Sequence, residues 1–247
     1  MVDAREVADH MIVTVASMLR DGERIFIGLN SYVPLLAAAV ARIIHGKRLS
    51  IYTVAETHNP ELERIRLKQS TGDPALAATG TVFITVEAFD LVQKGAIDVM
   101  FLGPVQVDGE TNINLSVIGS YEKPRVRLTG GAASAFIVPL IKKMIFWNTK
   151  HSKRGLVSRV DFITATAKNS DNEVWLCTNL CCFRYDRSLS KWVLEALHPW
   201  ASVDDVKENT GFEFVVGDVS TTRPPNEEEK ALISTLDPDE LRLKAFY

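Results

Sequence analysis

The feature of this sequence that most constrains its fold is a strand, a polar turn and a helix that follow one another repeatedly. Residues 24–28 (RIFIG) form an apolar run, and a polar turn leads from it into the alanine-rich stretch 34–44. The same order returns over 49–72, and the strand-like run 99–103 (VMFLG) follows a helical stretch at 87–94. Because parallel strands need a crossover connection, this repetition predicts an α/β fold with a mainly parallel, open twisted sheet flanked by helices.

Short strands dominate the second half of the chain. Asp108-Gly109 is a strong tight-turn signal within the stretch 105–119, which predicts a hairpin. Further strands are expected at 125–128, 160–164, 174–179, 181–185 and 192–197, and helices at 3–20, 202–209 and 227–236. The sequence has no repeat of fixed period and no clear linker, so we expect one domain over 1–247 with a β-rich C-terminal half. Gly155–Ser158 is the only candidate for a subdomain boundary.

Charge and hydropathy exclude two classes of partner. The net charge of −3 comes without the basic excess that a nucleic-acid-binding surface requires. The longest smooth apolar stretch, Val33–Ala41, is far too short to span a bilayer. Asp3, Arg5 and Glu6 stand where a signal peptide would have an apolar block. The sequence therefore predicts a cytoplasmic protein that binds neither nucleic acid nor a membrane.

The chain has three cysteines, Cys177, Cys181 and Cys182. Their spacing is not a zinc pattern, and no histidine stands at a metal-ligand distance from them in the sequence. We therefore expect no metal site. The thiols are expected to pack as small hydrophobic side chains on paired strands in a reducing compartment.

The strongest candidate for chemistry is Glu56. The run 51–54 reads as a buried strand, and Asn59-Pro60 supplies an N-cap residue and a proline for a helix that would run to Gly72. Glu56 would then lie between the carboxyl end of a strand and the amino end of a helix. Ligands gather in that crevice of open α/β sheets, and the helix terminus favours the ionised carboxylate. The alternative is an ordinary loop glutamate that faces water.

A run of tiny residues, 129–135, leads into a helix that Pro139 limits. Such a turn lets backbone N–H groups approach a ligand, because no side chain intervenes. The alternative is a Gly-Gly turn that only provides the strand-to-helix geometry.

Four other polar residues are candidates for substrate binding. Asn30 and Ser31 follow the first strand and would face the same crevice, although such a turn can also merely cap the next helix. His58 is a candidate base for activating water or a plain loop histidine. Gln106 is a candidate donor to an acyl carboxylate or hydroxyl, or a hairpin-edge residue.

Several of these segments together resemble the β subunit of the two-subunit family I CoA-transferases, in the glutaconate CoA-transferase branch. There a strand ends in Glu-Ser-Gly, and Val-Gly-Asp follows sixteen residues further on. Here Glu56-Thr57-His58 and Thr71-Gly72-Asp73 have the same spacing. Five more segments match in order over roughly residues 28 to 238: Gly103–Asp108 with Asn112–Asn114, Ile118–Tyr121, Thr129–Ala132, Glu208–Phe212 and Leu236–Pro238.

The resemblance implies a ping-pong reaction with Glu56 as the nucleophile. In this family the glutamate attacks an acyl-CoA to form a mixed anhydride, and the CoA thiolate returns to give a glutamyl-CoA thioester. A small carboxylic acid then accepts the CoA. By resemblance, backbone amides around Gly130, Gly131 and Ala132 would contact the oxyanion and the thioester. Coenzyme A would be a co-substrate with no permanently bound cofactor, and a homologous α subunit would complete an α2β2 assembly.

The sequence also departs from the family pattern. His58 replaces a glycine, about two extra residues separate Pro34 from Glu56, and the glycine-rich turn is a residue short. An alternative alignment would place Val54 at the nucleophile's position, whereas the alignment on Glu56 needs no gap to Gly72. The runner-up function is an acyl-CoA hydrolase subunit on the same fold, acting on a thioester or a C–C bond, as in breakdown of steroid-ring acyl-CoA. The third is a non-catalytic scaffold subunit.

Overall fold

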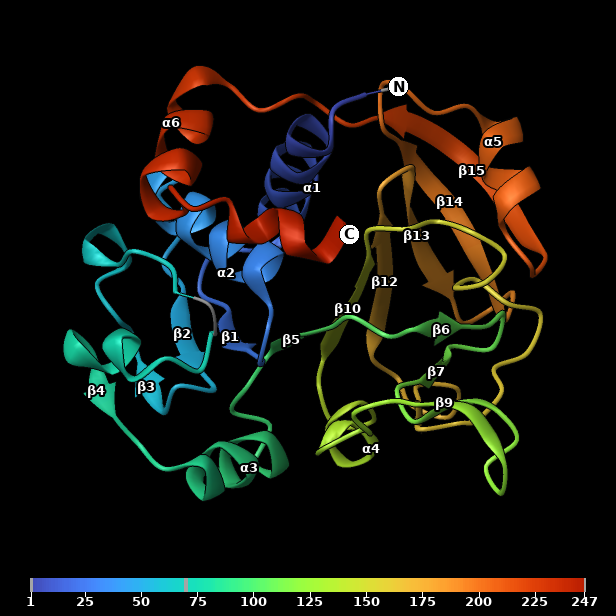
Figure 1. The fold of residues 1–247 in the computed structure, drawn as a ribbon, viewed down its shortest axis with the longest axis horizontal. Helices are drawn as coiled ribbons and strands as arrows, with labels where there is room; N and C mark the ends of the chain where they lie inside the picture. Colours follow the sequence, from blue (N-terminus) through green and yellow to red (C-terminus); the bar gives the residue numbers. More distant parts are fainter. Residues whose placement is uncertain (1, 69–70, 247) are drawn as a thin grey trace. The chain divides into compact units, whose positions relative to one another are not determined.

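The computed structural model describes residues 2–68 and 71–246, which divide into two compact units (Figure 1). Unit 1 extends to Phe101 and takes up the chain again from Arg223. Unit 2 comprises Leu102–Thr222. The C-terminal segment thus returns to the unit that the N-terminal segment began. The expectation of a single domain over 1–247 stays a prediction.

Unit 1 contains an open sheet whose strands follow the order β5-β1-β2-β3-β4. The three strands β5, β1 and β2 are parallel, and β3 and β4 continue the sheet with antiparallel pairs. Alternate residues of the parallel strands, including Ile25, Ile27 and Ile51, are fully buried, as the period of two requires. The strand bounds are β1 Arg24–Ile27, β2 Ser50–Thr53, β3 Thr57–His58, β4 Thr81–Val82 and β5 Val99–Leu102.

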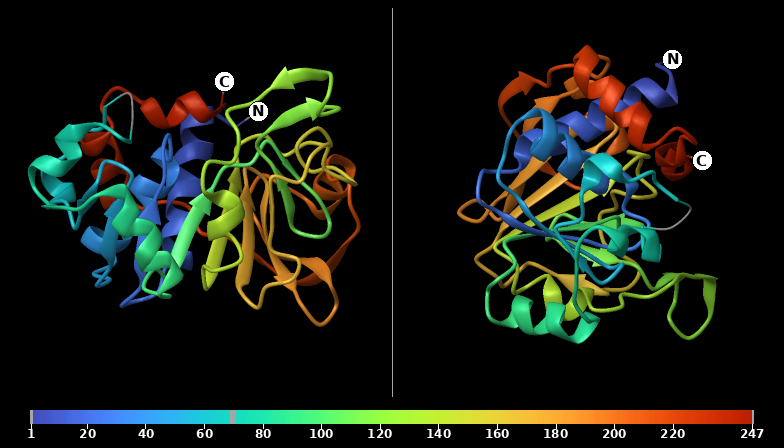
Figure 2. Two further views of the ribbon diagram at one scale, coloured as in Figure 1. Left: turned by 90° about the horizontal axis from the view of Figure 1, so that it is seen from below. Right: turned by 90° about the vertical axis from the view of Figure 1, so that its left-hand side faces the viewer.

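The helices of unit 1 gather mainly in one cluster (Figure 2). The helix α1 (Ala4–Met18) packs against α2 (Tyr32–Ala39), whose side chains are all buried, and against α6 (Glu227–Leu236). A π-helical turn, Val40–Ile44, continues α2. Figure 1 shows α3 (Thr85–Gln93) apart from this cluster. The 3-10 turns are Leu62–Arg64, Pro74–Ala78 and Leu241–Phe246.

Unit 2 is built mainly from strands. Its larger sheet has the order β15-β14-β13-β12-β10, in which β10–β12 and β14–β15 are parallel. Cys177 on β12 lies opposite Cys182 on β13, and all three cysteines are free and buried. The bounds are β6 Gln106–Val107, β7 Asn112–Asn114, β8 Val117–Gly119, β9 Pro124–Arg127, α4 Ser134–Ile137, β10 Lys143–Asn148, β11 Ala165–Thr166, β12 Glu173–Thr178, β13 Cys181–Asp186, β14 Lys191–Leu197, α5 Val203–Asn209 and β15 Phe214–Thr221.

The predicted class, α/β with a mainly parallel sheet flanked by helices and a β-rich C-terminal half, is confirmed. The hairpin at Asp108-Gly109 is also confirmed. Two predicted elements are wrong. The stretch 59–72 is not a helix beyond one 3-10 turn, because Leu67 N donates instead to Leu236 O at the end of α6. The stretch 160–164 is not a strand, and β10 and β15 were not predicted.

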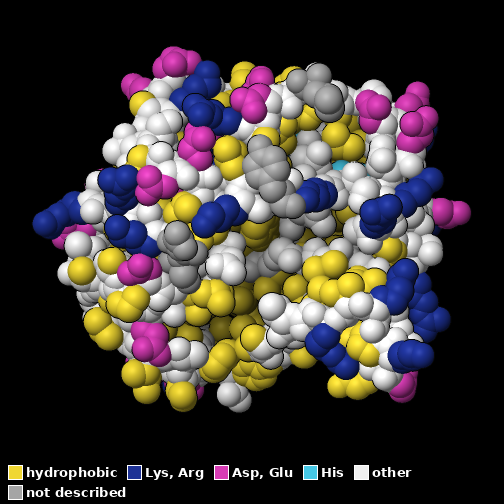
Figure 3. Space-filling view, viewed as in Figure 1, with side chains coloured by type: hydrophobic (Ala, Val, Ile, Leu, Met, Phe, Trp, Pro, Cys, Tyr) yellow, Lys and Arg dark blue, Asp and Glu magenta, His cyan; other side chains and the backbone are white. Residues whose placement is uncertain are grey.

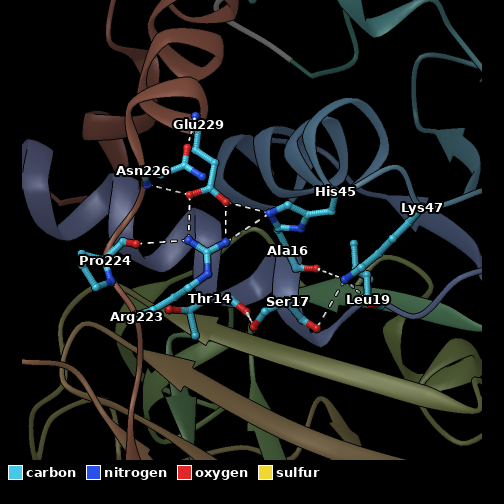
Figure 4. Close-up of polar contacts among 10 residues, drawn as sticks. All are labelled: Thr14, Ala16, Ser17, Leu19, His45, Lys47, Arg223, Pro224, Asn226 and Glu229. Carbon is cyan, nitrogen blue, oxygen red and sulfur yellow. Dashed lines mark hydrogen bonds and ion pairs between the residues drawn. The ribbon is translucent and has the colours of Figure 1, made fainter.

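One buried carboxylate, Glu229, ties the start of α6 to the segment after α2 (Figure 4). Its Oε1 lies 2.7 Å from His45 Nε2 and accepts from Arg223 Nη2 at 2.5 Å. Its Oε2 accepts from Arg223 Nη1 and Asn226 N, both at 2.8 Å. Burial by itself raises the pKa of Glu229, but the hydrogen bonds from Arg223, His45 and Asn226 outweigh it and hold the pKa at about 2. The same view shows Lys47 Nζ donating to Ala16 O and Leu19 O at the end of α1.

We expect Glu229→Gln to lower the free energy of unfolding by about 3 kcal/mol at neutral pH, since a pKa depressed from 4.5 to about 2 stabilises the folded state in its ionised form. This contribution is fully present above the ordinary pKa and is lost as the pH falls toward 2. The variant and the wild-type protein should therefore converge in acid, as urea unfolding at several pH values would measure. Glu228→Gln, an exposed neighbour in the same turn, is the control, and an equal loss in both variants would contradict the assignment.

Candidate active site

Glu56 lies in a tight hairpin loop between β2 and β3. Thr53 pairs with Thr57, so the loop consists of residues 54–56, and Glu56 N donates to Thr53 O at 3.0 Å. Glu56 has φ +57°, the left-handed conformation that Gly or Asn usually supplies at the end of a three-residue hairpin loop. A glutamate in this conformation costs about 1 kcal/mol or more. Backbone strain of this kind clusters at functional sites, which favours a role for the side chain.

The Glu56 carboxylate is held through one oxygen. Its Oε1 accepts from Thr85 N at 2.8 Å and from Thr85 Oγ1 at 2.7 Å, whereas Oε2 has no hydrogen-bond partner among residues 2–68 and 71–246. Both hydrogen bonds lower the pKa of Glu56, and the bond from the Thr85 hydroxyl has the larger effect. Thr85 is the first residue of α3. The carboxylate is therefore ionised at neutral pH and lies at the amino end of α3, not of the helix expected at 59–72.

The segment that carries Thr85 packs closely against the hairpin. Phe83 N donates to Glu56 O at 3.0 Å, and β4 pairs with β3. A Cβ at Gly80 would lie 2.3 Å from Thr57 Oγ1 and 2.7 Å from a backbone oxygen of β3, so only glycine fits there. Neither Gly80 nor Thr85 was predicted from the sequence. No local pattern links Thr85 to Glu56, because the two residues are 29 positions apart.

His58 on β3 contacts two side chains of the neighbouring strand β2. Its Nε2 lies 2.7 Å from Ser50 Oγ, and its ring stacks on Tyr52 with centroids 4.2 Å apart. Partial burial lowers the pKa of His58, so the ring is neutral at neutral pH. Its predicted role in activating water stays a prediction.

The turn after β1 is connected to the predicted Thr-Gly-Asp motif. Asn30 has φ +53° and is exposed, and Ser31 is buried. Ser31 N donates to Thr71 Oγ1 at 3.4 Å, and this hydroxyl donates to Gly28 O at 2.8 Å. The buried Thr71 therefore holds the turn that carries both candidates through its hydroxyl group. Substrate contacts of Asn30 and Ser31 stay predictions.

The remaining candidates lie in unit 2. Gln106 Oε1 accepts from Asn114 Nδ2 at 2.7 Å and from Asp161 N at 3.0 Å, so this oxygen holds the β6–β7 hairpin to a neighbouring loop. In the glycine-rich turn, Gly130 N donates to Leu115 O at 2.8 Å. Gly130 and Ala132 have φ values of +89° and +45°.

A Cβ at Gly131 would lie 2.4 Å from Thr164 Cγ2 and 2.7 Å from Ser134 Oγ, so a larger residue at this position would force these two side chains to move. The Gly130 amide already has an acceptor, whereas the amides of Gly131 and Ala132 donate to no backbone carbonyl among residues 2–68 and 71–246.

Exposed apolar side chains flank Thr85. Val82, Ile84 and Val86 are 66%, 57% and 69% exposed. They are close neighbours in the sequence of Thr85, which binds the Glu56 carboxylate. Figure 3 shows hydrophobic side chains gathering on the part of unit 1 where Figure 1 places β3, β4 and α3. In the part of the chain that the structure describes, no His, Cys, Asp or Glu side chains form a metal-binding group, and no helix is long and apolar enough to cross a membrane.

Comparison with known proteins relates this geometry to a family. The family model described as Coenzyme A transferase matches residues 8–209. The chain is 31% identical over 242 residues to the β subunit of the 3-oxoadipate CoA-transferase of Pseudomonas knackmussii, covering 92% of this chain and 91% of that protein. It is 24% identical over 233 residues to the β subunit of the glutaconate CoA-transferase of Acidaminococcus fermentans, covering 87% of this chain and 85% of that protein.

A solved structure is also similar. The decarboxylase AibA/AibB superimposes with a TM-score of 0.87 and 30% sequence identity, and the match covers 96% of each chain. The family match spans most of the sequence, and the resemblance to the β subunit of the glutaconate branch is confirmed by the two CoA-transferase relatives. The chain therefore belongs to the coenzyme A transferase family.

Proposed function

We propose that the chain is the β subunit of a CoA-transferase that moves CoA between an acyl-CoA and a carboxylic acid, with Glu56 as the nucleophile. The observation that carries this proposal is the strained Glu56, whose ionised carboxylate has one oxygen held by Thr85 and the other without a partner in the described chain. A nucleophilic carboxylate needs a free oxygen in a fixed orientation. Membership of the coenzyme A transferase family supports CoA as the group that is transferred.

In the proposed reaction, Glu56 Oε2 attacks the thioester carbonyl carbon of the acyl-CoA, the C–S bond breaks and the CoA thiolate leaves. The thiolate then attacks Glu56 Cδ, the Cδ–Oε2 bond breaks, and the first acid leaves as a carboxylate. The glutamyl-CoA thioester that remains is attacked by a carboxylate oxygen of the second acid, which releases the thiolate. The thiolate finally attacks the carbonyl of the new acid, and Glu56 is regenerated as a carboxylate.

Each attack creates an oxyanion that needs donors. One preorganised donor lowers the barrier by about 3 to 4 kcal/mol. By resemblance to the family, the backbone amides around Gly130, Gly131 and Ala132 stay the candidates for this role, and the Gly130 amide already donates to Leu115 O within its own unit. Asn30, Ser31, His58 and Gln106 stay candidates for contacts with the acid.

A homologous α subunit is the proposed partner, in an α2β2 assembly. Each of the two CoA-transferase relatives named above is one subunit of its enzyme, and the name AibA/AibB joins two components. The exposed Val82, Ile84 and Val86 are side chains that such a partner would cover. Covering them would also exclude water from Glu56, which protects a mixed anhydride and a thioester from hydrolysis.

Hydrolysis is the second candidate reaction on this fold. The observation that favours it is His58 in place of the family's glycine, next to a loop that carries the nucleophile. The relative AibA/AibB is a decarboxylase, so the fold accommodates more than one reaction. A non-catalytic scaffold subunit is the third candidate.

The test is to trap the intermediate. The complex of this chain with its partner subunit is mixed with acyl-CoA without an acceptor acid and then treated with borohydride, which reduces a thioester to an alcohol. Peptide mass spectrometry should find the reduced side chain at Glu56. An unmodified Glu56 during turnover would overturn the covalent role. Release of free CoA at the full turnover rate without any acceptor would show that the enzyme is a hydrolase.

A further inference from the structure

Thr85 touches the nucleophile through two donors that converge on one oxygen. The backbone N–H of Thr85 lies 2.8 Å and its hydroxyl oxygen 2.7 Å from Glu56 Oε1. These are the distances at which an oxyanion hole holds a developing negative charge. We propose, on the basis of the proposed function, that Thr85 is a catalytic residue whose N–H and O–H form the oxyanion hole for the tetrahedral intermediates on Glu56 itself.

The path of the two carboxylate oxygens supports this assignment. Oε2, which has no partner in the described chain, makes the attack and leaves with the first acid when the thiolate attacks Cδ. Oε1 stays on Cδ throughout, as the carbonyl oxygen of the anhydride and of the thioester. When the thiolate attacks Cδ, the C=O electron pair moves to Oε1, and the same happens when the second acid attacks. Both oxyanions form within reach of the two Thr85 donors.

Thr85 is itself held in place by its neighbours. Phe83 N donates to Glu56 O, and Ile84 N donates to Glu87 Oε2 at 2.9 Å. The next amide, that of Thr85, stands at the first position of α3 and has no acceptor within the helix, so it is free to donate to Glu56. The donors are therefore preorganised, and little reorganisation is needed when charge develops on Oε1.

The test compares Thr85→Val, which removes the hydroxyl but keeps the shape and the N–H, with Thr85→Ser, which keeps the hydroxyl. In the assembled complex, Thr85→Val should lower kcat by about 10²-fold, and Thr85→Ser should retain kcat within a few-fold. The acid limb of the pH profile should move to higher pH in Thr85→Val, because the hydroxyl no longer lowers the pKa of Glu56. A residue that only holds the ionised carboxylate would move that limb as well, so the fall in kcat on the plateau above the limb is the readout that reports stabilisation of the oxyanions.

Thr81→Val is the matched control, since Thr81 is an exposed threonine of β4 and should leave both readouts unchanged. Thr85→Ala is measured alongside and should lose as much activity as Thr85→Val. Wild-type activity in these two variants, or an equal loss in Thr85→Ser, would overturn the assignment. Borohydride trapping separates the two proposals. No adduct at Glu56 in the wild-type complex would reject both, whereas an adduct that forms at the same rate in Thr85→Val would reject only the role of Thr85.

Discussion

Glu56→Gln is expected to abolish CoA transfer, with a loss in kcat on the order of 10⁴-fold or more. The amide is not an anionic nucleophile, so no mixed anhydride can form. The amide oxygen of glutamine still accepts the two hydrogen bonds from Thr85, so the β2–β3 hairpin should keep its structure. Steady-state kinetics of the complex, with assembly checked by size-exclusion chromatography, measures this loss.

The matched control is Glu61→Gln. Glu61 is an exposed carboxylate five residues away, and its ion pair with Arg64 is on the surface. Activity in this variant should stay within about twofold, because exposed ion pairs contribute little. Full activity of Glu56→Gln in an intact complex would reject the nucleophile and favour the scaffold hypothesis.

Arg242→Met is expected to lower the free energy of unfolding by about 3 to 5 kcal/mol at neutral pH. The Arg242 side chain is 1% exposed, and it donates to Asp9 Oδ1 at 2.6 Å and to Asp237 Oδ2 at 3.0 Å. Methionine fills a similar volume but leaves two buried carboxylates without their cation. The cost should be smaller in acid, because burial already raises the pKa of Asp9 and protonation removes the uncompensated charge. Urea unfolding at several pH values would measure both effects.

Arg5→Met is the control for this prediction. Arg5 forms an exposed ion pair with Glu240 in the same unit, and its loss should cost no more than about 1 kcal/mol. If the two variants were equally stable, the buried cluster of Arg242, Asp9 and Asp237 would not be what holds the C-terminal segment in unit 1.

Local sequence signals predicted those elements whose stabilising contacts lie nearby in the chain. The helices α1, α5 and α6 begin where Asp3, Ser202 and Asn226 cap them, and each cap bonds within three residues. The hairpin at Asp108-Gly109 follows from its turn residues. The strand β10 was missed although its run of apolar and aromatic residues (MIFW) is a usable signal.

Tertiary contacts decided the surroundings of Glu56. The apolar spacing over 59–72 favoured a helix, but Leu67 pairs with Leu236, a residue far along the chain. The helix end at the carboxylate belongs instead to α3. No window of local sequence contains both partners, so propensity and periodicity could not predict either contact.

The order of its motifs determined which family this chain belongs to and which carboxylate is the candidate nucleophile, since both depend on residue types and spacing along the chain. The tertiary structure alone decided how that carboxylate is held. The two Thr85 donors on Oε1 and the Oε2 left unpartnered in the described chain depend on residues 29 positions apart that meet only in the folded chain. Hydrogen-bond geometry at this scale follows from packing, which local sequence patterns do not specify.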